Sequence, residues 1–224
     1  MCGRYTQSKS AEIIARAFQI DNVSDIEPRY NIAPTQSVLT VLQPSASANR
    51  QGKMLHWGLI PSWAKDRKMA SKLINARAET VAEKPAFRSA FRKRRCLVVA
   101  DGFYEWQQQE NKKQKQPFYF RLSDGEPFAF AGLWEHWQDA TGEEIESCTV
   151  LTTEANDLMR PIHNRMPVIL EPKNYDLWLD SEATKLELLQ PLLHPYPTEE
   201  MTAYPVSTVV NKPVNDSAEC INSI

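Results

Sequence analysis

Glycine is scarce in this sequence, and a glycine-rich phosphate loop, closely spaced cysteine pairs and a long apolar run are missing. Only seven of the 224 residues are glycine, and without a phosphate loop nucleotide hydrolysis is not expected. No stretch approaches the ~20 apolar residues of a membrane span, and the first ten residues lack the apolar core of a secretion signal. We therefore expect a cytoplasmic protein with no membrane contact.

The cysteines and histidines do not have the spacing of metal ligands. The four cysteines show no C-x-x-C pattern, and without an export signal they are expected to be free thiols. His56, His136 and His194 show no metal-type spacing among themselves or with a cysteine. We therefore expect no metal site and no cofactor.

Proline is more frequent than glycine in this sequence, and this composition predicts the kind of secondary structure. Fifteen prolines predict short strands and many turns rather than long helices. Ser10 can cap a helix over residues 11–18, and further helices are predicted at 85–91, 175–179 and 183–193. Strands are predicted at 38–42, 54–59, 96–100, 103–107, 117–122, 127–133, 148–153, 167–170 and 204–210. Residues 103–107 and 117–122 have the pattern of a hairpin.

These elements predict an α+β fold. The expected β core is largely antiparallel and barrel-like, with short helices at its periphery. There is no internal repeat and no clear domain boundary, so we predict a single domain over residues 1–224, with a core of about 2–212 and a polar C-terminal tail.

Positive charge is concentrated in one segment. Residues 65–95 hold eleven Lys or Arg and three acidic residues, a net charge of +8, so the rest of the chain carries −10 of the total −2. This asymmetry fits an electropositive groove that binds a polyanion. It fits equally a solvated segment whose charges are paired elsewhere in the fold.

Cys2 directly follows the initiator methionine, and its small side chain permits removal of Met1. The product is a 1,2-aminothiol whose α-amine has a reference pKa of about 8, so part of it is neutral at pH 7. A neutral amine condenses with an aldehyde, and the neighbouring thiol can then close a five-membered thiazolidine ring. Gly3 allows close backbone approach, and Arg4 places a permanent cation beside the terminus.

Several polar side chains stand in otherwise apolar surroundings. Asn31 precedes Ile-Ala-Pro, Asn75 shares a short motif with Arg77, Glu105 lies between two aromatic residues, and His163 lies in a proline-bounded loop. Taken singly, each such residue is more often structural than catalytic. Trp57 lies within a predicted strand and is assigned to the core, whereas Trp63 follows a proline and is the better candidate for stacking on a base.

Seven short motifs occur in order along almost the whole chain. They are MCGRYT (1–6), YNIAP (30–34), WGLIP (57–61), INARAET (74–80), ADGFYEW (100–106), IHNRMP (162–167) and PVS (205–207). Together they resemble the SOS response-associated peptidase (SRAP) family, sensors of abasic sites in single-stranded DNA. The resemblance implies that mature Cys2 forms a thiazolidine with the aldehyde of a ring-opened abasic sugar.

The resemblance also implies roles for other residues. Glu105 is expected to transfer protons at the amine and the sugar oxygen, His163 to assist ring opening and Schiff-base chemistry, and Asn75 to position the Cys2 end. Single-stranded DNA is expected to be contacted by six further residues, Arg4, Asn31, Pro34, Trp63, Arg77 and Arg165. The arginines would hold phosphates, and Pro34 and Trp63 would shape the site where the strand is kinked.

Two alternatives remain open from the sequence. A cysteine peptidase or amidase could use Cys2 with His163, oriented by Glu105 or Asn75. A non-enzymatic module could bind single strands through Trp63 and the basic segment alone. If the protein senses abasic sites, we expect it to be a monomer, because one active site binds one strand.

Overall fold

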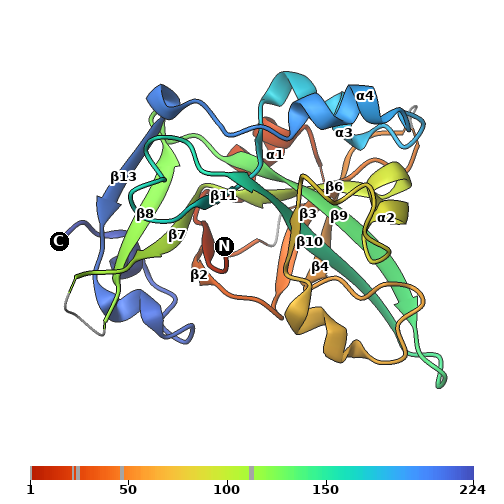
Figure 1. Ribbon diagram of the computed structural model, residues 1–224, viewed down its shortest axis with the longest axis horizontal. Helices are drawn as coiled ribbons and strands as arrows, with labels where there is room; N and C mark the ends of the chain where they lie inside the picture. The colour runs from red at the N-terminus through yellow and green to blue at the C-terminus, as the bar shows by residue number, and fades with distance from the viewer. Residues whose placement is uncertain (1, 22, 24–25, 46–47, 111–113) are drawn as a thin grey trace.

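The computed structural model describes residues 2–21, 23, 26–45, 48–110 and 114–224. Met1 and parts of the loops at 44–52 and 108–116 lie outside the described residues. Five strands close into a barrel (Figure 1): β3 (Ser37–Leu42), β4 (Gln51–Trp57), β6 (Arg95–Ala100), β9 (Phe128–Gln138) and β10 (Glu144–Glu154). Their order is β10-β4-β3-β6-β9, and β9 pairs again with β10. Only the β10–β4 pair of this ring is parallel.

Strand β6 shows why its apolar run is continuous instead of alternating. Successive side chains of a strand point to opposite faces. Leu97 and Val99 join one hydrophobic core, while Cys96, Val98 and Ala100 join another. Because both faces of β6 are covered, apolar residues are favoured at each position from Cys96 to Ala100.

The second sheet has five strands in the order β13-β8-β7-β1-β2. They are β1 (Tyr5–Gln7), β2 (Arg29–Ile32), β7 (Gly102–Gln107), β8 (Gln116–Leu122) and β13 (Met201–Pro205), all paired antiparallel. The predicted hairpin is confirmed as β7–β8. Three short strands extend the barrel: β5 (Asn75–Arg77) and β11 (Arg165–Pro167) pair with β10, and β12 (Ile169–Leu170) pairs with β9.

The helices are short and lie outside the β core. They are α1 (Ala11–Phe18), α2 (Arg88–Lys93), α3 (Tyr175–Leu179) and α4 (Leu186–Leu189), and their apolar residues pack on the first of the two cores. The structure also has short 3-10 helices, which are η1 (Arg67–Lys72), η2 (Pro172–Asn174), η3 (Gln190–Leu192), η4 (Thr198–Glu200), η5 (Thr208–Asn211) and η6 (Ala218–Ile221). The predicted fold class is confirmed. Among the described residues, no helix has the length and apolar character needed to cross a membrane.

Several predicted boundaries are wrong for identifiable reasons. The helix expected at 183–193 is reduced to α4 and η3 where Pro191 interrupts it. The strand expected at 204–210 ends at Pro205, and the chain then turns into η5. The strand expected at 54–59 ends at Trp57, because Gly58 adopts a φ of +133°. The polar tail is not a loose end, since η6 buries Cys220 completely.

Candidate functional site at the N-terminus

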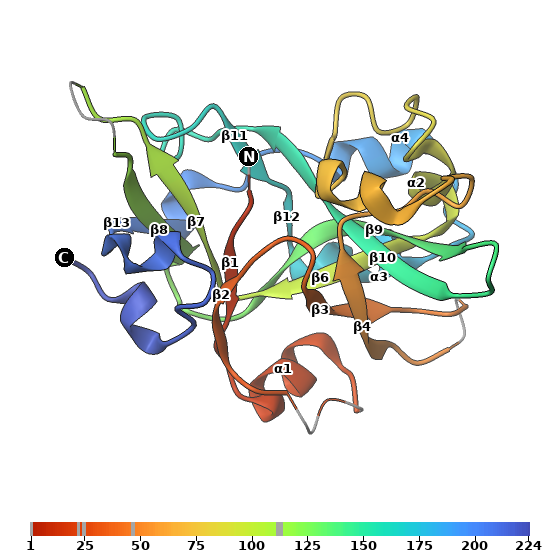
Figure 2. The same ribbon diagram turned by 90° about the horizontal axis from the view of Figure 1, so that it is seen from below.

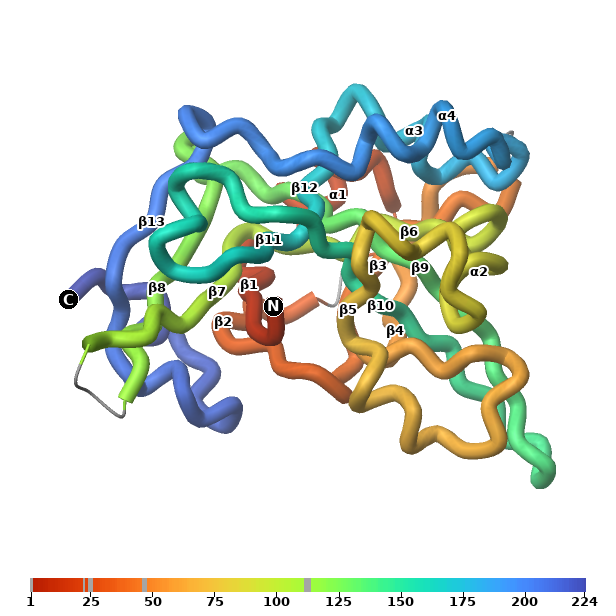
Figure 3. Tube along the Cα trace, viewed as in Figure 1, coloured from red at the N-terminus to blue at the C-terminus, as the bar shows by residue number. Residues whose placement is uncertain are grey.

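The N-terminal residues lie between the two sheets, beside β11 in both ribbon views (Figures 1 and 2). Cys2 is fully buried and belongs to the same core as Tyr5 and Trp57. Asn75, at the start of β5, donates a 2.8 Å hydrogen bond from Nδ2 to the carbonyl oxygen of Cys2. The trace in Figure 3 shows β5 on the barrel side of the N-terminus. The position of Cys2 is therefore fixed by a residue far away in the sequence.

Glu105 approaches the same end of the chain from the other sheet. The antiparallel pairing of Tyr5 with Phe103, and the hydrogen bond from Tyr104 N–H to the Arg4 carbonyl, bring the next residues of β7 alongside the first residues of the chain. Glu105 is only 4% exposed. Burial, and after it the negative charge of Glu105, raise the pKa of the Cys2 thiol to about 12.

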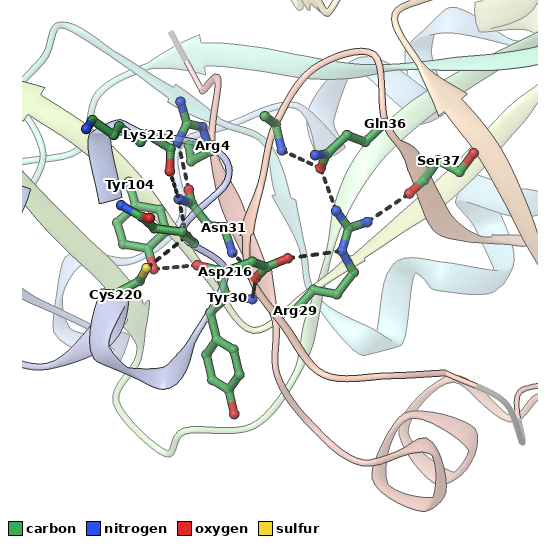
Figure 4. A network of polar contacts seen from close by, with 12 residues as sticks. Arg4, Arg29, Tyr30, Asn31, Gln36, Ser37, Tyr104, Lys212, Asp216 and Cys220 are labelled. Atoms are coloured by element: carbon green, nitrogen blue, oxygen red, sulfur yellow. Dashed lines mark hydrogen bonds and ion pairs between the residues drawn. The ribbon is translucent and has the colours of Figure 1, made fainter. Parts of the chain in front are cut away.

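Arg4 is held from below by Asn31. Its Nη1 donates 2.7 Å hydrogen bonds to Asn31 Oδ1 (Figure 4) and to the Val210 carbonyl. The guanidinium lies 5.7 Å from the centre of the Trp106 ring. Asn31 itself is fully buried, and its Nδ2 faces the carbonyls of Val210, Lys212 and Asn215. Direct contact of Asn31 with DNA does not fit this placement, because its amide is enclosed by protein. Asn31 instead supports Arg4.

Asn75 lines an open pocket of about 420 Å³, and two other predicted site residues line it too. Trp63 and Arg77 line it together with Lys84 and the buried ring of Phe87. The Trp63 side chain is 59% exposed, whereas Trp57 is fully buried, as predicted. Pro34 does not line this pocket; it lies half-buried at the turn after β2.

His163 and Arg165 form a local unit at the start of β11. His163 Nδ1 lies 3.0 Å from the Arg165 backbone nitrogen, from which it can accept, and 3.2 Å from the Arg165 carbonyl oxygen, to which it can donate. The Arg165 guanidinium binds both oxygens of Glu79, at 2.5 and 3.0 Å, and the Thr152 carbonyl. A phosphate that approaches Arg165 must therefore compete with Glu79.

The basic segment divides into structural and exposed cations. Arg95 is buried and donates to the carbonyls of Phe91, Arg92, Trp178, Asp180 and Ala183. Arg94 pairs with the buried carboxylate of Glu135. For these two cations the alternative of charges paired within the fold therefore applies, while the other nine are exposed.

Sequence reasoning missed three residues beside Arg4. Trp106, Lys115 and Asn211 line a second open pocket with it, of about 530 Å³. Trp106 donates from Nε1 to Asn211 Oδ1 at 2.7 Å. The adjacency of Trp106 to Glu105 was the available signal, but its partner Asn211 lies 105 positions away. Within the described ranges, no three His, Cys, Asp or Glu side chains gather as a metal-binding group.

The fold and the site define a single-domain, mainly β protein whose candidate reactive group is the cysteine at position 2. Comparison with protein families matches residues 1–213 to "SOS response associated peptidase (SRAP)". The chain belongs to this family.

Curated relatives and solved structures agree with this assignment. The abasic site processing protein YoqW of Bacillus subtilis is 46% identical over 226 residues, with 100% of both chains covered. The abasic site processing protein HMCES of Xenopus tropicalis is 35% identical over 225 residues, covering 88% of this chain and 67% of that protein. A crystal structure of a protein from Bacteroides thetaiotaomicron superposes with a TM-score of 0.88 at 28% identity over the full length of both chains.

Proposed function

We propose that this protein captures abasic sites in single-stranded DNA by forming a covalent thiazolidine through Cys2 after Met1 has been removed. The observation that carries the proposal is the setting of Cys2, anchored by Asn75 and influenced by the charge of Glu105. The curated relatives named above as abasic site processing proteins support the choice of lesion. The bound lesion would thereby be shielded during the DNA damage response.

The reaction needs no external oxidant or reductant. The α-amine of Cys2 adds to the aldehyde carbon of the ring-opened sugar, and loss of one water gives an imine. The Cys2 sulfur then bonds to the imine carbon while the thiol proton passes to nitrogen. The five-membered ring closes with the former aldehyde carbon bonded to both nitrogen and sulfur. Ring closure is intramolecular, which favours it over attack by a separate thiol.

Neighbouring side chains supply proton transfer and positioning. Glu105 accepts the proton that the ammonium must lose and returns one to the departing oxygen. His163 assists opening of the sugar ring. Asn75 holds the Cys2 carbonyl, and its buried Oδ1 has no hydrogen-bond partner among the described residues. This oxygen can accept a hydrogen bond from the new α-amine.

The strand is contacted on both sides of Cys2. Arg4 and Arg77 hold flanking phosphates, Trp63 stacks on or wedges against a base beside the 420 Å³ pocket, and Pro34 shapes the turn nearby. Arg165 contacts DNA only when a phosphate displaces Glu79. The protein acts as a monomer in this proposal, and its peptidase activity is limited to removal of Met1.

The alternative cysteine peptidase requires a reactive thiolate. Reactive cysteines have thiol pKa values lowered to roughly 3.5–7.5, whereas burial and Glu105 raise that of Cys2 to about 12. This direction favours the amine-dependent reaction. The binding-only alternative assigns no task to Cys2 and predicts that its replacement is harmless.

A denaturing gel tests the proposal. Purified protein, with Met1 removal verified by intact mass, is incubated with a single-stranded oligonucleotide that carries one abasic site. We expect a shifted band that survives boiling in detergent, disappears in Cys2→Ala and persists in Cys96→Ala, a matched buried thiol. An oligonucleotide with a tetrahydrofuran at the lesion, which lacks the aldehyde, should give no band. A band that remains in Cys2→Ala would move the adduct to a lysine, and no band with Met1 removed would favour the peptidase.

A further inference from the structure

The C-terminal segment 208–220 contacts strand β2 in two ways: its carbonyls accept hydrogen bonds from the Asn31 amide, and one carboxylate, that of Asp216, binds the β2 backbone. Asp216 Oδ1 accepts hydrogen bonds from the backbone N–H groups of Tyr30, at 2.5 Å, and Asn31, at 2.9 Å, while Oδ2 lies 3.5 Å from Arg29 Nε (Figure 4). The family match ends at residue 213, before Asp216. The part of the chain that makes this contact is therefore outside the matched region.

The two N–H groups belong to a β-bulge. Strand β2 is the edge of its sheet, and its register with β1 shifts between the pairs Tyr5–Ile32 and Gln7–Arg29. Three steps along β2 thus oppose two along β1, which leaves adjacent N–H groups outside the ladder. Asp216 satisfies both of them. Because a bulge redirects side chains, capping it also fixes the direction of Asn31.

Asn31 transmits this position to Arg4. The Val210 carbonyl accepts from both Asn31 Nδ2, at 3.1 Å, and Arg4 Nη1, at 2.7 Å, and Asn31 Oδ1 accepts from the same Nη1. Among the described residues, Arg4 Nη2 has no protein acceptor. One edge of the guanidinium is thus tied to the bulge and the tail, and Nη2 remains for a ligand oxygen.

We propose that Asp216 is a positioning residue that sets Arg4 to receive a phosphate of the bound strand. The proposal rests on the proposed function for the identity of the ligand, a single-stranded DNA backbone. An unrestrained arginine loses considerable rotamer freedom when it binds, and an arginine already held by carbonyl acceptors loses less. Removing the carboxylate takes away the protein acceptor of the Tyr30 and Asn31 N–H groups, so the bulge rearranges and Arg4 loses its supports.

The experiment measures reversible binding in the Cys2→Ala background, by fluorescence anisotropy of a labelled single-stranded oligonucleotide at several salt concentrations. We expect Asp216→Ala to weaken binding by about three- to tenfold, a part of what loss of a charge-assisted hydrogen bond causes. The slope of log K against log salt should fall by up to about 0.7, the value for one phosphate on a single strand. Asp216→Asn retains an oxygen for both N–H groups and should restore most of the slope.

A double-mutant cycle shows whether Asp216 acts through Arg4. In an Arg4→Ala background, Asp216→Ala should change the affinity by less than about twofold, because the contact that it positions is already absent. Asp176→Ala is the matched control. Asp176 lies on α3, and its replacement also breaks an aspartate–arginine contact, the one with Arg50. If Asp216→Ala does not fold, Asp216→Glu keeps the charge, displaces the carboxylate and should give the same pattern.

The outcomes separate this proposal from the proposed function. The positioning role is overturned if Asp216→Ala lowers the affinity equally in the Arg4 and Arg4→Ala backgrounds. It is also overturned if Asp216→Ala has the same affinity and salt slope as the Asp176→Ala control. Failure of the wild-type protein to cross-link abasic DNA overturns covalent capture, yet the salt slopes still test the link between Asp216 and Arg4. Cross-linking that is normal at saturating DNA in Asp216→Ala, but requires more DNA, supports both proposals.

Discussion

Replacing Asn75 with alanine tests how the Cys2 end is held. Asn75 lies on β5, whose backbone pairs with β10 from Val150 to Thr152, so truncating the side chain leaves the strand in place. The truncation removes the 2.8 Å hydrogen bond to the Cys2 carbonyl. A single hydrogen bond contributes about 0.5–1.5 kcal/mol, which corresponds to a roughly two- to tenfold slower cross-linking step.

The assay is single-turnover cross-linking over a range of DNA concentrations, which separates the maximal rate constant from the half-saturating concentration. We expect Asn75→Ala to lower the maximal rate constant and to leave half-saturation nearly unchanged. Asn174→Ala, at the start of α3 where the side chain makes no capping hydrogen bond, should change neither. A normal maximal rate constant with weaker saturation would refute positioning and make Asn75 a DNA contact of the pocket that it lines.

Four further predictions concern charge. Glu105→Gln should slow cross-linking by roughly a hundredfold through lost proton transfer. In the same variant, alkylation of the Cys2 thiol, monitored by mass spectrometry, should begin at lower pH, because the negative charge that raises the pKa of this thiol is gone. Arg77→Ala should reduce the salt slope of binding by about 0.7. By contrast, Arg95→Met should leave the salt slope unchanged, as a salt titration of binding will measure. Because buried carbonyls lose their donor, it should lower the free energy of unfolding by about 2–4 kcal/mol, as a urea titration will measure. The free energy of unfolding should also fall as pH rises from 9 toward 12, because folding raises the Cys2 pKa from 9.0 to about 12 and the folded protein keeps a proton that the unfolded chain releases. The stability that depends on the protonated Cys2 thiol is fully present below pH 9. Urea titrations should therefore show a smaller fall in the free energy of unfolding between pH 9 and 12 for Cys2→Ala than for the wild type.

Local patterns carried most of the fold prediction. The apolar run of β6 and the spacing of β7 and β8 depend on neighbouring residues, so the strands could be found and the fold class followed from their number. Element ends were less predictable where proline or a glycine with positive φ decided them, as at Pro191 and Gly58. The motif order indicated the family because seven short matches constrain one another in ways that a single motif does not.

Side-chain roles that depend on distant carbonyls could not be predicted. Asn31 and its acceptor Val210 are 179 positions apart, and the pattern around Asn31 contains no sign of the bulge beneath it. Arg95 follows three other cations and has the local pattern of a surface residue, yet it binds Trp178 across 83 positions. In both cases the fold creates the acceptors, so composition alone could not distinguish a ligand-binding residue from a structural one.

In the proposed capture reaction, the surroundings of Cys2 decide which of its two nucleophiles acts first. Burial holds the pKa of the Cys2 thiol above its usual range, so at neutral pH the thiol is mostly protonated, whereas an α-amine with a reference pKa of about 8 is partly neutral. The amine therefore attacks the aldehyde first. The thiol acts only when the imine carbon is already held beside it, and its proton can then pass to the imine nitrogen in the same step. Burial that would disable Cys2 as a peptidase nucleophile thus leaves open the one reaction in which the thiol needs no prior ionisation.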